Sequence, residues 1–494
     1  MKADNQNLEN KKIIFVLLAI ILFGDILRTN AFSNSAKRTW YGVDMTGTIV
    51  KDKECPLEVE EEELTFDISE FPDSYYDNEE KFLAYSGKVT AKYTFYNPKD
   101  YKVTAKLVFP FGNYPDYGSY KYSHENNTSS FANDIYKYGV KVNDKEIKSV
   151  LRHTFSTEGS KFNLENDMSL LHVGFVKDDF YSPNLTVTKY TFEVSGIDEG
   201  KYPYASEAVE IPAFDGKRKF WLQDGSGYDR KEDESSQLSL RAKNGEEVVL
   251  YVIGEPVTDD LKWNLYKDGG NKSGEEIDGR LTLKNTEELS FKEFTLAEYN
   301  EKSNIMESDW YNVMVYLFNR NGMENSSAIL PDIYNSSERL RFLLRWYEYE
   351  ITLNPGEKIV NTVEAPMYPA IDLSYEPGRY DYTYLLSPAS TWAKFGKLNI
   401  DINTQFNMLE NNQEGFDKTS SGYNFKSDGL PEGELKFSLS ESEKPKKKDD
   451  GTIWFFVGFL VLGILHVIGY IIFGVVVIIL LIVVVKKFIG KKKE

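Results

Sequence analysis

Histidine side chains are the first place to look for chemistry in this chain. Three of them, His124, His153 and His172, lie between the two apolar end segments. A helical zinc site of the His-Glu-x-x-His type needs two histidines four positions apart, and no such pair occurs. His172 follows two leucines, which favours a histidine in a sheet over a ligand. Nucleophile-elbow, phosphate-loop and dinucleotide-binding patterns are also absent. We therefore predict no catalytic, metal-binding or cofactor-binding residues.

Carboxylates are abundant, with 77 Asp and Glu residues. Glycoside hydrolysis needs only two well-placed carboxylates, so an extracellular hydrolase using paired carboxylates remains an alternative function. The sequence lacks the alternating strand and helix pattern of the commonest glycosidase scaffold. The acidic, glycine-containing stretch at 223–234 lacks the ligand spacing of a calcium loop and is predicted to be a surface loop.

Tyrosines are the best candidates for ligand contact. Tyr114, Tyr117 and Tyr120 lie among Gly and Pro in a segment without strand periodicity. This segment follows a predicted strand, and loops at strand ends often carry the binding residues of β-sandwiches. We predict that these three side chains face a ligand. The alternative is that they pack in a core, as we expect for most other aromatic residues of the chain.

The elements that must position these residues are mainly strands, because apolar residues alternate with period two. The clearest hairpin joins 87–95 to 103–109 through the turn at 97–100, and a second joins 138–142 to 146–150. Only 308–319 shows convincing helical spacing. The pattern predicts an all-β fold of two tandem Ig-like β-sandwich domains with a short helical insertion. We place these domains at 37–230 and 231–405, followed by a stalk at 406–452.

The two ends carry apolar segments. Residues 13–24 form a short apolar run after two lysines, typical of a signal peptide within 1–36, although an uncleaved anchor is also possible. Residues 453–485 contain no formal charge and are long enough to cross a bilayer as a transmembrane helix. The basic tail at 486–494 predicts a cytoplasmic C-terminus. A membrane hairpin within 453–485 would instead leave the tail outside.

Net charge and cysteine content narrow the compartment and the partners. The chain has a formal net charge of −19 while both ends are basic, so its middle is strongly acidic. An acidic surface repels nucleic acid, which we exclude as a partner. A single cysteine, Cys55, in an exported chain of 494 residues favours a bacterial protein over a disulfide-rich eukaryotic one.

Several segments resemble a family of uncharacterised bacterial exported β-rich proteins. The resemblance rests on GKVTAKYTFYNPKDYKVTAKLVFPFG at 87–112, on the acidic strand at 59–68, and on TLNPGEKIVNTVEAP and YTYLLSPASTWAKFGKLNIDI further on. The first of these segments is also similar, more weakly, to sandwiches of the vault and inter-alpha-trypsin type. The resemblance implies an exported β-sandwich architecture and supplies no catalytic residue.

Together these features predict a single-pass protein of the bacterial cell membrane, with its bulk extracellular. We expect a non-catalytic binding or structural module of the cell envelope that contacts the bilayer through 453–485. Its other partner would be an envelope or extracellular ligand that the sequence does not identify. An accessory subunit of a membrane complex is a further alternative to the hydrolase.

Overall fold

The computed structural model describes residues 39–40, 45–51, 54–72, 87–112, 139–156, 162–257, 261–267, 275–297, 299, 305–321, 328–330 and 343–448. The predicted signal segment, membrane span and basic tail lie outside these ranges, as do His124 and the loop with Tyr114, Tyr117 and Tyr120. In the part of the chain that is described, no helix combines the length and apolarity needed to cross a membrane.

Strands dominate the described residues, which confirms the predicted all-β class. The strands up to the middle of the chain are β1 (Thr39–Trp40), β2 (Met45–Thr46), β3 (Ile49–Val50), β4 (Glu58–Ile68), β5 (Gly87–Tyr96), β6 (Val103–Gly112), β7 (Val140–Val142), β8 (Lys145–Glu146), β9 (Val150–Phe155), β10 (Thr186–Ser195), β11 (Ser206–Ile211), β12 (Arg218–Leu222), β13 (Gly227–Arg230), β14 (Ser236–Arg241), β15 (Glu247–Gly254), β16 (Trp263–Tyr266) and β17 (Arg280–Ser290).

The later strands are β18 (Leu343–Leu353), β19 (Lys358–Met367), β20 (Ala370–Asp372), β21 (Tyr375–Glu376), β22 (Arg379–Leu385), β23 (Phe395–Thr404), β24 (Asn407–Asn411), β25 (Asp417–Lys418), β26 (Gly422–Asp428), β27 (Leu435–Ser440) and β28 (Lys446–Lys447). The helices are α4 (Leu164–Ser169), α5 (Phe291–Leu296), α6 (Glu307–Asn321) and the 3-10 helix η4 (Ser387–Thr391). The predicted helix at 308–319 is therefore confirmed as α6.

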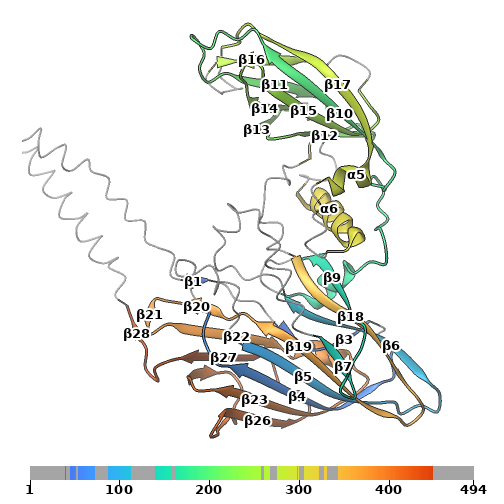
Figure 1. Ribbon diagram of the computed structural model, residues 1–494, viewed down its shortest axis with the longest axis vertical. Helices are drawn as coiled ribbons and strands as arrows, with labels where there is room; N and C mark the ends of the chain where they lie inside the picture. Colours follow the sequence, from blue (N-terminus) through green and yellow to red (C-terminus); the bar gives the residue numbers. More distant parts are fainter. Residues whose placement is uncertain are drawn as a thin grey trace, which may run out of the picture. The chain divides into compact units, whose positions relative to one another are not determined.

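Strand pairing divides these elements into two sets, which we call the host body (39–156 and 343–448) and the inserted body (186–290). The host body contains the sheets β25-β26-β23-β4-β5-β19-β7-β8, β3-β6-β18-β9 and β1-β20-β22-β27-β24, while the inserted body contains β12-β15-β10-β17 and β13-β14-β11-β16. In Figure 1 the blue strands and the orange strands lie together in the host body, although the green inserted strands come between them in sequence.

The predicted domain boundary at residues 230 and 231 is therefore wrong. β10 pairs with both β15 and β17 across that boundary, and β4 pairs in parallel with β23 near the other end of the chain. Alternation reveals that a segment is a strand, but it carries no information about which strand lies beside it. Two sequential domains were the simplest reading of the pattern, and the pairing contradicts it.

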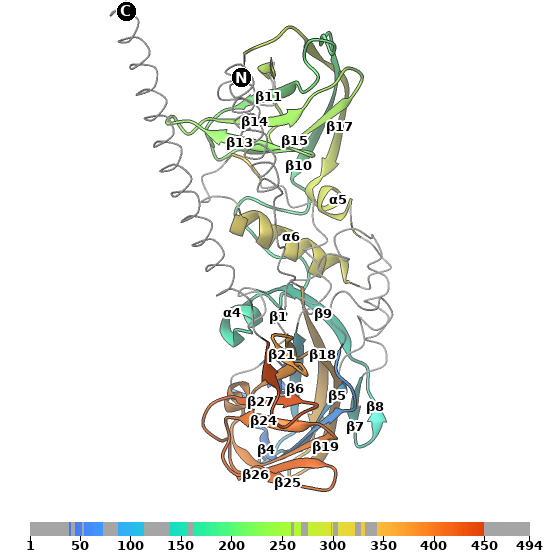
Figure 2. The ribbon, with the colours of Figure 1, turned by 90° about the vertical axis from the view of Figure 1, so that its left-hand side faces the viewer.

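The predicted stalk is wrong as well, as far as it is described. Residues 406–448 contain the five strands β24 to β28, and Phe437 and Leu439 of β27 are buried in the host core. Figure 2 shows β24, β25, β26 and β27 as part of the same body as β4 and β19. Short strands separated by Asn, Gly and Ser turns leave too few alternating residues in a row to be recognised from sequence.

The hairpin expected between 87–95 and 103–109 does not form, although both strands exist. β5 pairs with β4 and β19, whereas β6 pairs with β3 and β18, so the chain crosses from one sheet to another between them. Asn97 is fully buried in this crossing, and its Nδ2 donates to the carbonyl oxygens of Tyr101, Leu353 and Asn354 at 2.9–3.1 Å. The crossing from β18 to β19 is thus tied to the crossing from β5 to β6.

The second predicted hairpin forms in a shorter version, with 141–142 paired to 145–146, whereas Val150 belongs to β9 and pairs with β18. β7 and β8 pair, and the two residues of their turn, Asn143 and Asp144, have φ angles of 48° and 61°. Asn and Asp tolerate this left-handed region better than other residues with a side chain, so the turn chemistry matches the sequence.

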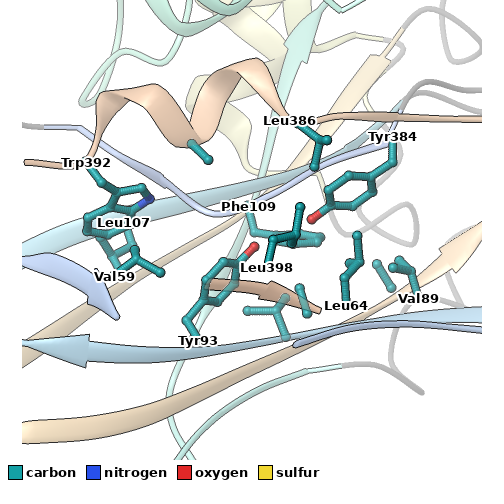
Figure 3. Close-up of a cluster of buried hydrophobic side chains, with 14 of the residues drawn as sticks. Val59, Leu64, Val89, Tyr93, Leu107, Phe109, Tyr384, Leu386, Trp392 and Leu398 are labelled. Carbon is teal, nitrogen blue, oxygen red and sulfur yellow. The ribbon is translucent and has the colours of Figure 1, made fainter. Parts of the chain in front are cut away.

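The host body encloses a large core between its sheets. Leu64 and Phe66 of β4, Val89 and Tyr93 of β5 and Leu398 of β23 belong to it. Figure 3 shows the rings of Tyr93 and Tyr384 entering this cluster from different strands, with both hydroxyl groups directed inward. Two phenol groups in an apolar core need hydrogen-bond partners. The Tyr384 hydroxyl donates to Glu62, and the Tyr93 oxygen accepts from the N–H of Thr48.

Candidate functional site

Helix α6 brings polar side chains of distant segments together. Its first turn carries Glu307 and Asp309, where acidic groups complement the helix dipole. Residues at helical spacing, including Met314 and Phe318, are fully buried against α5 and the inserted body. Phe155 and Leu343 of the host strands belong to the same apolar cluster. The helix therefore packs against strand ends of the host body through apolar contacts, with charged groups beside them.

The charged group beside this cluster is Arg152 of β9. Its Nε and Nη2 donate to the carboxylate of Asp309 at 2.8–3.2 Å, and its Nη1 donates to Glu348 of β18 at 2.7 Å. Nη2 also donates to the carbonyl oxygen of His172 at 2.6 Å. Burial lowers the pKa of Arg152, but Asp309 and Glu348 outweigh this effect and hold the pKa above its usual value. The guanidinium is thus fully engaged by two carboxylates from different elements.

Next to this ion pair lies a pocket of about 120 Å³ between β9, the 170–178 segment and α6. Half of its lining is apolar and comes from Phe155, Leu170, Val176, Val313, Val315 and Tyr316. The polar lining comes from His153, Thr154, His172, Asp178, Asn312 and Asn319.

His153 is the unusual member of this lining. It is 4% exposed, and its Nδ1 has no hydrogen-bond partner in the described structure. Its backbone N–H donates to Asp309 at 2.8 Å, which fixes the strand beside the ion pair. Burial, with the nearby charges of Arg345 and Arg152, lowers the pKa of His153 to about 3. The ring is therefore neutral at physiological pH.

His172 lies in the same lining, and its pKa is shifted in the same direction. Partial burial and the charge of Arg152 lower its pKa below the usual value. It belongs to the segment between α4 and β10 and not to a strand, so the expectation of a sheet histidine is wrong. The two imidazoles with Asp178 suggest a metal site at first sight. However, within the described ranges no three His, Cys, Asp or Glu side chains are placed to hold a metal ion.

Three other polar side chains of the pocket already form hydrogen bonds within the protein. Asn312 accepts from the N–H of Val176 at 2.7 Å and donates to the carbonyl of Gly174 at 2.9 Å. Asn319 donates to Asp178 at 2.7 Å, and Thr154 accepts from the indole N–H of Trp346 at 2.9 Å. These bonds shape the wall of the pocket and leave its two imidazoles, of which His153 is buried and His172 is half-buried.

Sequence reasoning did not identify this site. The predicted ligand contacts at Tyr114, Tyr117 and Tyr120 lie outside the described residues, so they stay a prediction. His153 was recognised as one of three histidines, but nothing in its neighbours signals that α6 and the 170–178 segment close around it. A partial signal was available at Asp309, an acidic residue in the first turn of the one predicted helix.

Comparisons with known proteins add little. No protein-family model matches the chain, and no curated protein matches it. Among solved structures it is similar to a Legionella pneumophila protein provisionally described as a nutrient binding protein. The two share 9% sequence identity with a TM-score of 0.32, over 82% of this chain and 72% of that one. A similarity of this size supports no argument about function.

Proposed function

We propose that this chain is a membrane-anchored bacterial surface protein whose β-rich body is a non-catalytic binding module of the cell envelope. The proposal combines two β-sandwich bodies, one inserted into the other, with the anchor and export signal read from the sequence at 453–485 and 1–36. In this proposal the bulk of the chain is extracellular and the basic tail is cytoplasmic.

The observation that carries the binding function is the pocket beside α6 with its unpartnered imidazole. A buried polar group without a hydrogen bond costs stability, on the order of 1–3 kcal/mol, unless a ligand or ordered water satisfies it. Ligand pockets are typically apolar concavities with a few polar groups of this kind. His153, in a pocket where half of the lining residues are apolar, fits that description.

The hydrolase alternative receives less support from the same region. Asp309 and Glu348 are two carboxylates close to one another, as a hydrolase would require, but both accept hydrogen bonds from Arg152. A catalytic pair needs one carboxyl group to hold a proton and the other to approach the substrate. Two carboxylates paired with one guanidinium are instead suited to fixing α6 against β9 and β18.

Binding is tested by asking what co-purifies with the protein. The full chain would be purified from its own membranes and examined by native mass spectrometry. We expect a bound small molecule that is lost from Leu170→Phe, in which a larger side chain enters the pocket from a half-buried wall position. Leu283→Phe makes the same change at an exposed position of β17 and should retain the molecule. Equal occupancy in both variants would contradict a binding function at this pocket.

Anchoring and topology are tested separately by adding protease to intact cells. The proposal expects loss of the body and survival of a short fragment that carries an epitope at the C-terminus. Degradation of that epitope would contradict a cytoplasmic tail and would favour a membrane hairpin.

A further inference from the structure

We propose that the pocket beside α6 binds a small uncharged molecule of about one ring that carries a single hydrogen-bonding group, with the phenol class as the simplest example. This inference rests on the proposed binding function and adds the chemical class of the ligand. It follows from the volume of the pocket, the charges around it and the hydrogen bonds already made by its wall.

The volume limits the size of the ligand. The pocket measures about 120 Å³. A dry cavity of about 150 Å³ lined by aliphatic and aromatic residues binds benzene in an engineered protein. The present pocket is slightly smaller and partly open, so a single six-membered ring is about the largest rigid group that it holds. Nucleotides, lipids and oligosaccharides exceed it.

The surrounding charges favour a neutral ligand. Arg152 lies beside the pocket but is paired with Asp309 and Glu348, so it offers no free charge to an anion. Burial lowers the pKa of both His153 and His172, and the positive charge of Arg152 lowers it further. The same charge disfavours a cation. Asp178 accepts at Oδ1 from the N–H groups of Phe180 and Tyr181 and at Oδ2 from Asn319, but these neutral donors do not cancel the charge of its carboxylate. That negative charge disfavours an anion in the pocket.

The hydrogen bonds of the wall limit the polar groups that a ligand carries. Asn312, Asn319 and Thr154 use their side chains within the protein, as described above. His153 retains a ring nitrogen without a partner. A monosaccharide would bury several hydroxyl groups with too few partners, and each unpaired hydroxyl would be costly. One hydroxyl on an apolar ring matches the one buried imidazole nitrogen that lacks a partner, with the apolar half of the lining around the ring.

The experiment compares phenol, benzene and glucose as probes of the full chain in detergent, by ligand-observed NMR titration. We expect saturable binding of phenol, benzene weaker by about five- to tenfold for the loss of one hydrogen bond, and no binding of glucose. In His153→Leu the difference between phenol and benzene should disappear while benzene still binds. The Nδ1 atom of His153 has no hydrogen-bond partner, so this substitution breaks no bond at that atom. A melting curve checks that it folds.

Blocking variants locate the site. Leu170→Phe should abolish binding of both aromatic probes, whereas the matched change Leu283→Phe should leave both dissociation constants unchanged. Equal affinities for phenol and benzene in the unmodified chain would overturn the inference, and so would phenol binding that survives Leu170→Phe. If these probes fail but a co-purified molecule is still lost from Leu170→Phe, the ligand class is wrong and the binding function stands.

Discussion

The host body and the inserted body each bury a glutamate in a sheet that faces a core, but the hydrogen-bond partners of the two carboxyl groups differ. Glu62 of β4 is 1% exposed and Glu207 of β11 is 0% exposed. In each case the alternation of the strand puts the carboxyl group on the same face as core residues, such as Leu64 in β4 and Val209 in β11. Neither group has a basic partner in the hydrogen bonds and ion pairs of the described residues.

Glu62 is embedded in a network of phenol groups. Tyr384 donates to its Oε1 at 3.3 Å, and Tyr93 also hydrogen-bonds to it. The Tyr93 oxygen accepts in turn from the backbone N–H of Thr48 at 2.9 Å. Burial raises the pKa of Glu62 to about 7, and the two tyrosine hydrogen bonds limit that rise.

Glu207 has no such network. Both of its carboxyl oxygens lack a hydrogen-bond partner in the described structure. Burial, with a smaller contribution from the charge of Glu246, raises its pKa to about 8. The comparison shows how partners tune a buried acid: two phenol donors stabilise the ionised form of Glu62, and their absence leaves Glu207 protonated to higher pH.

The largest expected effect follows from replacing Glu207. An unfolded carboxyl ionises near pH 4.5, while folded Glu207 keeps its proton to about pH 8. The unfolded state therefore binds fewer protons over this interval, and stability falls as pH rises from about 4.5 to about 8. Glu207→Leu should raise the local free energy of unfolding by about 5 kcal/mol at pH 9 and by much less at pH 4. Hydrogen exchange of the β11 amides measures this, and an equal gain at both pH values would contradict it.

A smaller dependence of stability on pH is expected for Glu62. Its folded pKa of about 7 makes stability fall as pH rises from about 4.5 to about 7. Glu62→Gln cannot ionise and keeps an oxygen that accepts from Tyr384. We expect a gain of about 3 kcal/mol at pH 8 in the exchange of the β4 amides, with little change at pH 4. Loss of stability at pH 8 would mean that the ionised carboxylate contributes to the fold.

The smallest effect is expected when Glu62 loses one of its hydrogen-bond donors and so becomes more like Glu207. Tyr384→Phe removes one donor, so the pKa of Glu62 should rise further and the host body should lose about 1 kcal/mol at pH 8. The titration of the Glu62 carboxyl, followed by NMR, measures the first effect. In the background of Glu62→Gln the cost of Tyr384→Phe should shrink, because the pair is coupled. Additive costs would show that the two residues act independently.

Part of this arrangement could be predicted from the sequence. Glu62 lies two residues before Leu64 and four before Phe66, so period two places it on the buried face. Described only as an acidic strand at 59–68, the segment does not single out Glu62 among its neighbouring glutamates. The position of the strands, the β7–β8 hairpin and α6 followed from local patterns. Local patterns succeed wherever the stabilising contacts are between near neighbours in sequence.

What could not be predicted depends on contacts between distant residues. Asn97 looks like an ordinary turn residue, yet its amide bonds to a second crossing more than 250 residues later. The same holds for Arg152, whose partners Asp309 and Glu348 come from the segment before β18 and from β18 itself. No spacing rule relates such positions, so neither the pairing of β6 with β18 nor the pocket could be derived from one sequence.

The insertion of one body within the other has a consequence for biosynthesis. Phe155 at the end of β9 pairs with Leu343 at the start of β18, so the inserted body leaves and rejoins the host body at adjacent positions. A chain made from its N-terminus presents β4, β5 and β6 before β18, β19 and β23 exist. In the named sheets the inserted strands pair only with one another, and Phe220 of β12 adds a bridge to Ile329, so all these partners precede β18 in the chain. β5, β6 and β9 must therefore wait for β18 and β19 while the inserted body is synthesised, although β4 and β5 can already pair with each other.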